Sequence, residues 1–230
     1  MNKLNAIIIA IGFVISSIIL AWGLGQIKGQ SNFVTVKGLS EKEVMADRAW
    51  WSINTQINAN TTEEMQSRIT RLESQIKSFY KKHGFTEAEI NTPSFNVYQN
   101  NYKDATSRLN GDYKLSVTTD DITKVRKAVK STGDLISQGI LLQSDPWSSG
   151  PKYYFTKFKE LKKEMLAEAT KEAKSAAQEF ATNSGSSVGK IRRANQGVFQ
   201  ILPGNRTQEN EVFFPEKIVR VVSTVDYFLD

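Results

Sequence analysis

A long uncharged stretch near the N-terminus sets the first constraint on this chain. No charged residue occurs between Lys3 and Lys28, and most side chains in this stretch are apolar. A helix needs about 20 apolar residues to cross the hydrocarbon core of a bilayer, whereas a secretory signal has a shorter apolar centre of roughly 7 to 15 residues. The length therefore predicts a retained transmembrane anchor over residues 1–28, with Trp22 at the membrane interface.

A signal peptide that is removed is the alternative for the same stretch. Ala21-Trp22-Gly23 has the small-x-small pattern of a cleavage site, so cleavage after Gly23 or Gly25 stays open. A short N-terminal tail followed by a long chain is the usual form of a signal-anchor protein. In either case we expect residues 29–230 to lie outside the cytoplasmic membrane.

The residue inventory excludes several kinds of site. The chain has no cysteine, which removes disulfides, thiolate zinc sites and cysteine nucleophiles. Its formal net charge is +6, but the basic residues are spread among acidic ones over several segments. We interpret them as solvated helix faces and turns rather than as a stripe for nucleic acid, so no nucleic-acid partner is expected.

Periodicity predicts regular structure immediately after the anchor. Residues 33–38 and 49–59 have strand patterns, the second with strict alternation of apolar and polar side chains. The apolar spacing then changes to three and four residues, which predicts a helix that begins with a capping box at Thr61 and Glu64 and stops at Gly84. The apolar face of this helix consists of Met65, Ile69, Leu72, Ile76 and Phe79.

The rest of the chain alternates strands with helices. Two strands are expected to pair through a turn at Asn110-Gly111, and a helix is expected from an N-cap at Asp120 to a stop at Gly133. The remaining strands are predicted over residues 95–103, 111–119, 139–145, 186–202 and 216–230, and a long helix over 153–185. The inward side chains of that helix are predicted to be Phe155, Phe158, Met165, Ala169, Ala173, Ala176 and Phe180.

The order of these elements predicts the fold class. Strands, a helix, a hairpin, a helix, a strand, a long helix and two strands indicate an α+β protein, with helices packed on a largely antiparallel sheet. One domain is expected over residues 29–230, preceded by the N-terminal transmembrane helix. Residues 218–222 are apolar at nearly every position, which predicts that the last strand is covered on both faces and locks the C-terminus into the sheet.

Few residues offer catalytic or ligand-binding chemistry. The only histidine, His83, stands at a predicted helix end, where a cation suits the helix dipole, and it has no second ligand beside it. The segment after Gly185 has too few residues between its glycines for a phosphate loop, and Ile191 replaces the Ser or Thr that would bind magnesium. Asp120 and Asp121 could bind a cation, although a capped helix start explains both.

Two further pairs leave alternatives open. Glu41 and Glu43 could form an acid/base pair, but on a strand or turn they are better interpreted as exposed side chains. Trp50 and Trp51 could stack on a ligand, although one of two adjacent strand residues must face the core. The sequence therefore predicts no catalytic, cofactor-binding or metal-binding residue and a protein that is not an enzyme. A hydrolase that uses Glu or Asp is the least supported hypothesis.

Five segments, taken in order, carry a resemblance to a known family. In residues 33–57 a strand ending in glycine is followed by a short polar link and a second strand introduced by Ala46-Asp47. The other four segments are KKHGFTEAEINTPSFNVY, YKLSVTTDDITKVRKAV, LKKEMLAEATKEAKSAAQEFA and IVRVVSTVDYFL. Over residues 33–229 the chain resembles the SIMPL-domain family.

The resemblance implies a location and a class of protein. Bacterial members of this family are envelope proteins, periplasmic or membrane-anchored, with a tie to stress tolerance and ring-like oligomers in at least one branch. A mammalian relative is a kinase-associated signalling adaptor. No catalytic residue comes with the resemblance. It also implies that the charged, glycine-bearing segment from Lys37 to Glu43 turns the chain between the first two strands.

Two hypotheses of different classes follow. The first is a single-pass protein of the bacterial cytoplasmic membrane whose periplasmic domain forms a homo-oligomeric scaffold or channel-like assembly, linked to envelope or oxidative stress tolerance. The second is a monomeric binding module, or adaptor, for another envelope protein. A ring of copies is required by the first hypothesis and excluded by the second.

Overall fold

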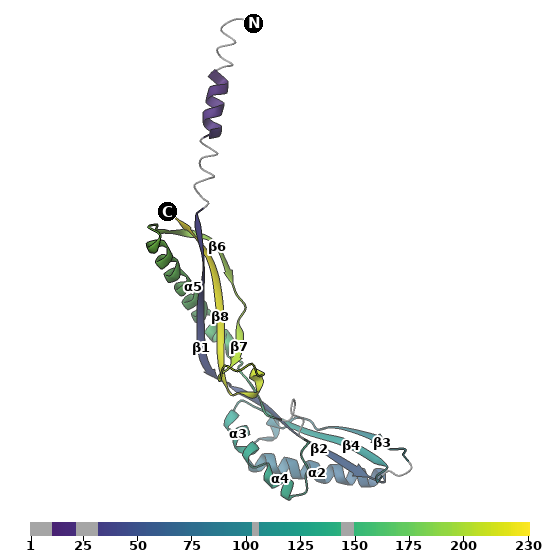
Figure 1. Cartoon of the computed structure of the whole chain (residues 1–230). Coiled ribbons are helices and arrows are strands. Elements are labelled where there is room, and N and C mark those ends of the chain that lie inside the picture. Colours follow the sequence, from purple (N-terminus) through teal and green to yellow (C-terminus); the bar gives the residue numbers. More distant parts are fainter. Residues whose placement is uncertain (1–10, 22–31, 103–105, 144–149) are drawn as a thin grey trace, which may run out of the picture. The chain divides into compact units, whose positions relative to one another are not determined.

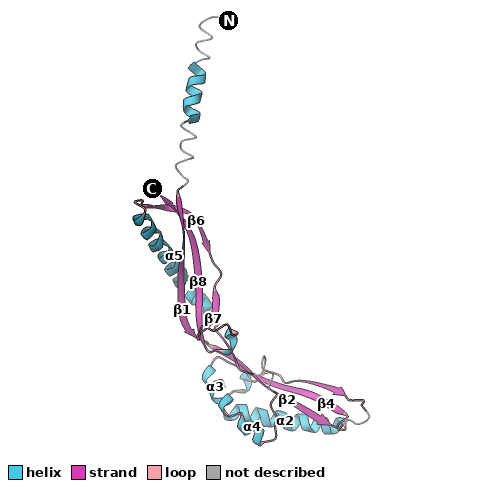
Figure 2. Cartoon of the chain, viewed as in Figure 1, coloured by secondary structure: helices cyan, strands magenta, loops and turns pink. Residues whose placement is uncertain are grey.

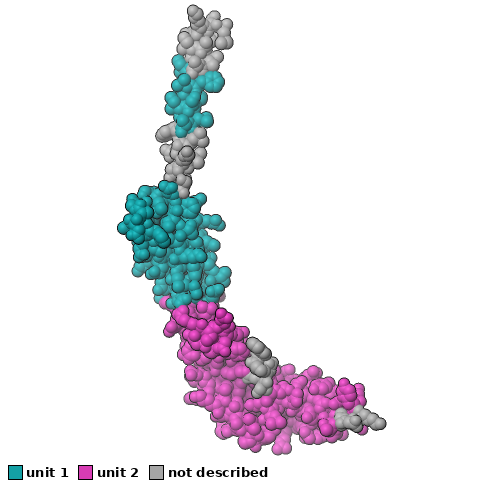
Figure 3. Space-filling view, in the orientation of Figure 1, with its two compact units in different colours: residues 1–41, 162–200, 220–230 teal, residues 42–161, 201–219 magenta. Residues whose placement is uncertain are grey.

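The computed structural model describes residues 11–21, 32–102, 106–143 and 150–230. The chain divides into two compact units, which Figure 3 shows in different colours. One unit comprises residues 1–41, 162–200 and 220–230, and the other comprises residues 42–161 and 201–219.

The predicted anchor falls mostly outside the described residues. Of residues 1–28, only 11–21 are described, and they are helical. Within the described part of the chain, no helix is long and apolar enough to cross a membrane. The anchor, the cleavage site after Gly23 or Gly25 and the interfacial position of Trp22 therefore stay predictions.

The first sheet lies in the unit of residues 42–161 and 201–219. Its strand order is β3-β4-β2-β5, and each neighbouring pair is antiparallel. The strands are β2 (Arg48–Ala59), β3 (Ser94–Gln99), β4 (Leu109–Thr119) and β5 (Lys152–Tyr154). The helices α2 (Thr62–Lys82), α3 (Ile122–Lys130) and α4 (Gly133–Ser137) pack on one face (Figure 1). The short 3-10 helices are η1 (Glu87–Glu89) and η2 (Glu211–Phe213).

The core of this unit follows from the alternation along β2. Trp51 and Ile53 face the helices and are 3% and 1% exposed, whereas the even-numbered side chains face the other way. Trp51 makes edge contacts with Phe79 and Tyr80 of α2, with ring centroids 6.2 and 5.7 Å apart. The Tyr80 hydroxyl donates to the Leu115 carbonyl at 3.0 Å, so this buried polar group is satisfied.

The sequence prediction of α2 is confirmed at both ends. Thr61 is the N-cap and accepts from the Glu64 backbone N–H, and Glu64 in turn accepts from the Asn60 N–H. At the other end His83 is the C-cap, and Gly84 adopts a positive φ of 85° that releases the chain from the helix.

Two predicted turn and cap positions in this unit are wrong. Asn110 and Gly111 lie inside β4, paired with Tyr98 and Val97 of β3, so the hairpin itself is confirmed but its turn is not there. The N-cap of α3 is Asp121, one residue later than predicted, because its carboxylate accepts from the Thr123 N–H.

Two other expected elements also differ. Gly133 does not end a helix but is the first residue of α4, and the chain leaves that helix at Gly139 with a φ of 82°. In the strand predicted over residues 139–145, Leu142 forms only an isolated bridge to Thr55. Residues 144 and 145 lie outside the described part of the chain.

The second sheet is built around the C-terminal strand. Its order is β1-β8-β6, and β7 also pairs with β8. The strands are β1 (Phe33–Met45), β6 (Val188–Gln196), β7 (Gln200–Pro203) and β8 (Glu216–Leu229), and the accompanying helix is α5 (Phe158–Asn183) (Figure 2). The prediction that the C-terminus is locked into a sheet is thus confirmed, since β8 is hydrogen-bonded on both sides.

The segment from Lys37 to Glu43 does not turn the chain, as the resemblance had implied, but continues β1. Val36, Gly38 and Ser40 alternate inward and are buried, and the chain turns only after Met45. Gly38 is needed for close approach, because a Cβ there would lie 1.8 Å from the carbonyl oxygen of Ala169 in α5. Next to it, the Ser40 hydroxyl donates to the Glu168 carboxylate at 2.7 Å.

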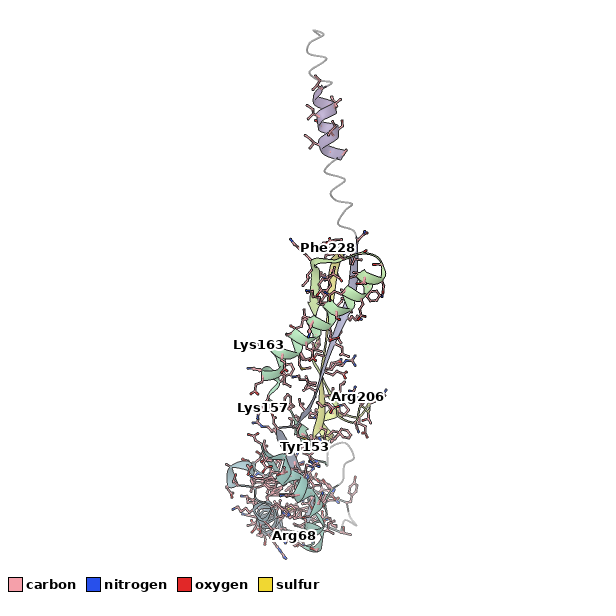
Figure 4. All side chains as sticks on the ribbon, turned by 90° about the vertical axis from the view of Figure 1, so that its left-hand side faces the viewer. Arg68, Tyr153, Lys157, Lys163, Arg206 and Phe228 are labelled. Atoms are coloured by element: carbon pink, nitrogen blue, oxygen red, sulfur yellow. The ribbon has the colours of Figure 1, made fainter. Side chains whose placement is uncertain are left out.

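The helix α5 begins later than predicted and buries a narrower stripe. Tyr153 and Tyr154, which the sequence placed in the long helix, belong to β5, and Phe155 lies before the helix. The buried positions of α5 recur every four residues and do not include Phe180, which is therefore 60% exposed. The buried side chains of α5 are Met165, Ala169, Ala173, Ala177 and Ala181. Lys163, labelled in Figure 4, lies on its exposed side.

Candidate interaction surface

The predicted candidates for chemistry occupy structural positions. His83 ends α2, with its Nδ1 2.9 Å from the Phe79 carbonyl oxygen. Gly185 has a φ of 72° and ends α5, as expected. Asp120 forms an ion pair with Arg48 at 2.7 Å, which lowers the pKa of that carboxyl.

Glu41 and Glu43 both lie on β1. Glu41 carries an ion pair to Arg220, with the closest atoms 3.6 Å apart, so its charge already has a structural partner. Among the described residues, no group of three or more His, Cys, Asp or Glu side chains could hold a metal ion. An acid/base pair therefore finds no support in this geometry.

A partly buried carboxylate that the sequence did not single out is Glu89 of η1. It accepts hydrogen bonds from the Thr119 hydroxyl, from the Thr86 backbone N–H at 2.8 Å and from the Lys124 ammonium at 3.0 Å. Burial alone would raise the pKa of Glu89, but these hydrogen bonds outweigh it and lower the pKa to about 2. Glu89 thus ties η1 to β4 and α3.

This carboxylate gives a pH-dependent contribution to stability. Because the folded pKa lies below the ordinary value of 4.5, the contribution is complete above pH 4.5 and is lost as the pH falls toward 2. We expect Glu89→Gln to lower the free energy of unfolding at pH 7 and to differ least from the wild type near pH 2. Urea unfolding at a series of pH values measures this difference. A deficit independent of pH would contradict the assignment.

The two adjacent tryptophans divide between the faces of the first sheet, as expected of neighbouring strand residues. Trp51 belongs to the core, whereas Trp50 is partly exposed on the face away from the helices. There the ammonium groups of Lys114 and Lys152 lie 4.9 and 5.3 Å from the Trp50 ring centroid, within cation–π distance.

The edge strand β3 is the most unusual exposed element of the fold. All six of its residues are exposed, and it ends the first sheet, so one side of its backbone has no strand neighbour among the described residues. Phe95, Val97 and Tyr98 are 58%, 39% and 50% exposed, and Tyr102 just beyond the strand is 85% exposed. No charged residue occurs between Glu89 and Lys103.

The edges of the second sheet differ from β3 in charge. The edge strand β6 carries Lys190, Arg192 and Arg193, and β1 carries lysines and glutamates. Natural proteins commonly place charges on edge strands to prevent pairing with other chains. Among the residues that the structure describes, β3 carries no such charge and exposes aromatic side chains instead. The sequence predicted this strand but could not predict its exposure, because periodicity does not tell an edge strand from a central one.

Comparison with known proteins agrees with this architecture. A family model described as "SIMPL: Protein of unknown function (DUF541)" matches residues 34–225. The matched range includes all the helices of both units after residue 33 and both sheets except Phe33 and the last four residues of β8, and it leaves out the N-terminal stretch. No curated protein matches the chain.

Proposed function

The chain belongs to the SIMPL family, and we propose that it is a non-enzymatic, membrane-anchored envelope protein whose outer domain assembles with further copies of itself. The observation that carries the proposal is the uncharged, exposed edge strand β3. Membrane anchoring through residues 1–28, a periplasmic outer domain and a role in stress tolerance complete the proposal and rest on the N-terminal sequence and on the family resemblance.

In this proposal, the backbone hydrogen-bonding groups of β3 provide the affinity of one copy for another. An edge strand presents a row of N–H and C=O groups that another strand can pair with. Two copies of β3 in antiparallel register would join two first sheets into one continuous sheet about a two-fold axis. Phe95 and Val97 lie on the same face of β3, opposite Tyr113 and Gly111 of β4, and would pack against the same side chains of the second copy.

The charge pattern favours a second copy as the partner. Strands from two copies that carry like charges repel each other, and β6 with its three basic residues would do so. Residues 90–102 carry no charge and meet no such repulsion when they pair with themselves. Anchoring in one membrane also concentrates the copies, so that a modest strand contact is enough for assembly.

The alternative is a monomeric binding module that uses the same edge. An extended segment of another envelope protein could add to β3 by the same backbone pairing. The two functions differ in one observable, because self-assembly produces an oligomer of the purified chain whereas the module stays monomeric until its partner is added.

Placing a lysine on β3 tests the proposal. Membranes that contain the full chain are washed with carbonate and dissolved in mild detergent, and the mass of the protein is measured by light scattering. We expect the chain to stay with the washed membranes and to be extracted as an oligomer, and we expect Val97→Lys to reduce it to a monomer, since the introduced charge faces its own copy. The side chain at this position is already 39% exposed, so the variant should fold.

A matched control separates pairing from surface charge. Val198→Lys introduces the same charge at a position that is 84% exposed and outside β3, and it should leave the oligomer intact. A monomeric wild-type chain would overturn self-assembly in favour of the binding module. An oligomer that persists in Val97→Lys would show that β3 is not the interface, and loss of the chain from washed membranes would refute the anchor.

A further inference from the structure

The face of the first sheet that points away from the helices has an aromatic centre. Arg48, Trp50, Thr118, Lys152 and Tyr154 line a hollow of about 340 Å³ on this face. The volume lies at the low end of the roughly 300 to 1,000 Å³ of small-molecule sites. We call these five residues together with Lys114 the Trp50 surface. All six lie in one compact unit, on three neighbouring strands.

The strand register explains why these side chains meet. Trp50 of β2 stands directly opposite Thr118 of β4 on one side and Lys152 of β5 on the other, and Arg48 stands opposite Tyr154. Residues directly opposite one another on a sheet share a face. Pairing therefore places Lys152 directly beside Trp50, whereas Lys114 stands opposite Asn54 and its long side chain reaches the ring along the sheet.

The basic side chains of this surface differ in whether they form a salt bridge. Arg48 is paired with Asp120 at 2.7 Å. Within the described part of the chain, neither Lys114 nor Lys152 forms a salt bridge, and their ammonium groups are held only near the indole ring. Two ammonium groups without a salt-bridge partner among the described residues lie over one aromatic ring, so the surface suits a ligand that has both a ring and a negative charge.

Uncharged polar side chains also lie near the ring. Next to Trp50 on the same face of β2, Ser52 is 5% exposed, and its hydroxyl has no hydrogen-bond partner among the described residues. On the neighbouring strand β4, the hydroxyls of Ser116 and Thr118 accept hydrogen bonds from the side-chain amide of Asn91, at 3.0 and 3.1 Å. Of these groups, Thr118 lines the hollow, and its hydroxyl matches the hydroxyls of a sugar.

From this arrangement we infer that the Trp50 surface binds an acidic polysaccharide, one sugar ring stacking on Trp50 while its carboxylate or that of the next ring pairs with Lys114 or Lys152. The apolar C–H face of a pyranose packs on the indole, and the polymer extends beyond the hollow along the sheet. The choice of a polysaccharide over other anions rests on the proposed location of the domain outside the cytoplasm.

A nucleic acid is the less favoured occupant. Its bases would also stack on Trp50, but single-stranded binding relies on a basic groove that follows many phosphates. The Trp50 surface offers two free lysines around one ring, and Asp112 on the same face of β4 interrupts the positive charge near Lys114. One stacked ring with one or two carboxylates fits that pattern better than a phosphate backbone.

Calorimetric titration of the detergent-purified full chain with a short oligogalacturonate tests the inference. We expect binding that weakens with salt, a loss of roughly tenfold or more in affinity for Trp50→Ala, and partial retention in Trp50→Tyr. Lys114→Gln and Lys152→Gln should each weaken binding and reduce its salt dependence. Gln56→Ala, an exposed change on the same face of β2, should bind as the wild type does.

Two further ligands decide which chemistry is recognised. The methyl ester of the same oligosaccharide keeps the rings and lacks the charges, and polyphosphate keeps the charges and lacks the rings. Weaker binding of both supports the inference. No binding of oligogalacturonate, equal binding of its ester, or equal binding of polyphosphate that Trp50→Ala leaves unchanged would each overturn it. Val97→Lys should bind the oligosaccharide normally, so a failure of self-assembly is distinguishable from a failure of this site.

Discussion

Gly38→Ala is expected to destabilise the unit of residues 1–41, 162–200 and 220–230 by about 3 kcal/mol or more, or to prevent it from folding. A Cβ at this position would lie 1.8 Å from the Ala169 carbonyl oxygen and 2.5 Å from the Ala173 nitrogen of α5. These are backbone atoms, so no side-chain rotation can relieve the clash and the whole helix has to move away from β1. Small native proteins have a total stability of about 5 to 15 kcal/mol, so this loss is severe.

Chemical unfolding of the purified variants measures this effect. Gly133→Ala is the matched control, since a Cβ there meets no atom within 4 Å and the residue begins α4 with an ordinary backbone conformation. It should leave stability unchanged or raise it slightly. Equal unfolding midpoints for the two variants would show that β1 and α5 do not approach as closely as the structure has them.

Gly38 also shows where reasoning from the sequence reaches its limit. The family resemblance implied a turn in the charged, glycine-bearing segment from Lys37 to Glu43, and glycine and serine are common in turns. The physical reason for the glycine is instead a contact with Ala169 and Ala173, which lie far away in the sequence. Gly111 is a similar case, because a Cβ there would come within 2.8 Å of the Asn96 carbonyl oxygen on the neighbouring strand.

Elements with a strong period were predicted well. The apolar face of α2, the alternation of β2 and the cap at Thr61 depend on neighbours within a few residues, and the structure confirms all three. The direction of Phe180 was wrong, since the row of buried alanines in α5 fixes which side faces the sheet and an aromatic residue can lie outside it.

The surfaces could be predicted least. The sequence offered Trp50 as a possible stacking residue, but only the register of β2 with β4 and β5 brings Lys114 and Lys152 to its ring. The exposure of β3 depends on which strand ends the sheet, and strand order is a property of the complete fold. In both cases the local pattern was correct, and the contacts on which the two proposals depend are not local.

Val221→Asp is expected to have an effect as large as that of Gly38→Ala. Val221 is 0% exposed on β8, the strand hydrogen-bonded between β1 and β6. Burial of a valine contributes about 1.5 to 3 kcal/mol, and a carboxylate in its place would be buried as well. An isolated buried charge is so costly that such a group takes up a proton instead, at a further cost of a few kcal/mol at neutral pH. We expect little folded protein at pH 7.

The pH dependence of the unfolding free energy of Val221→Asp shows whether the buried carboxylate causes the loss of stability. Burial raises the folded pKa of the new carboxyl above its unfolded value of about 3.9, so the extra loss should be largest at pH 7 and should shrink as the pH falls toward that value. The matched control is Val222→Asp, which places the carboxylate on the opposite, partly exposed face of β8 and should cost much less. Unfolding curves for both variants relative to the wild type, at pH 7 and near pH 4, measure the two differences. Equal losses for Val221→Asp and Val222→Asp would mean that the two faces of β8 are buried alike, and the alternation on which the second sheet depends would be refuted.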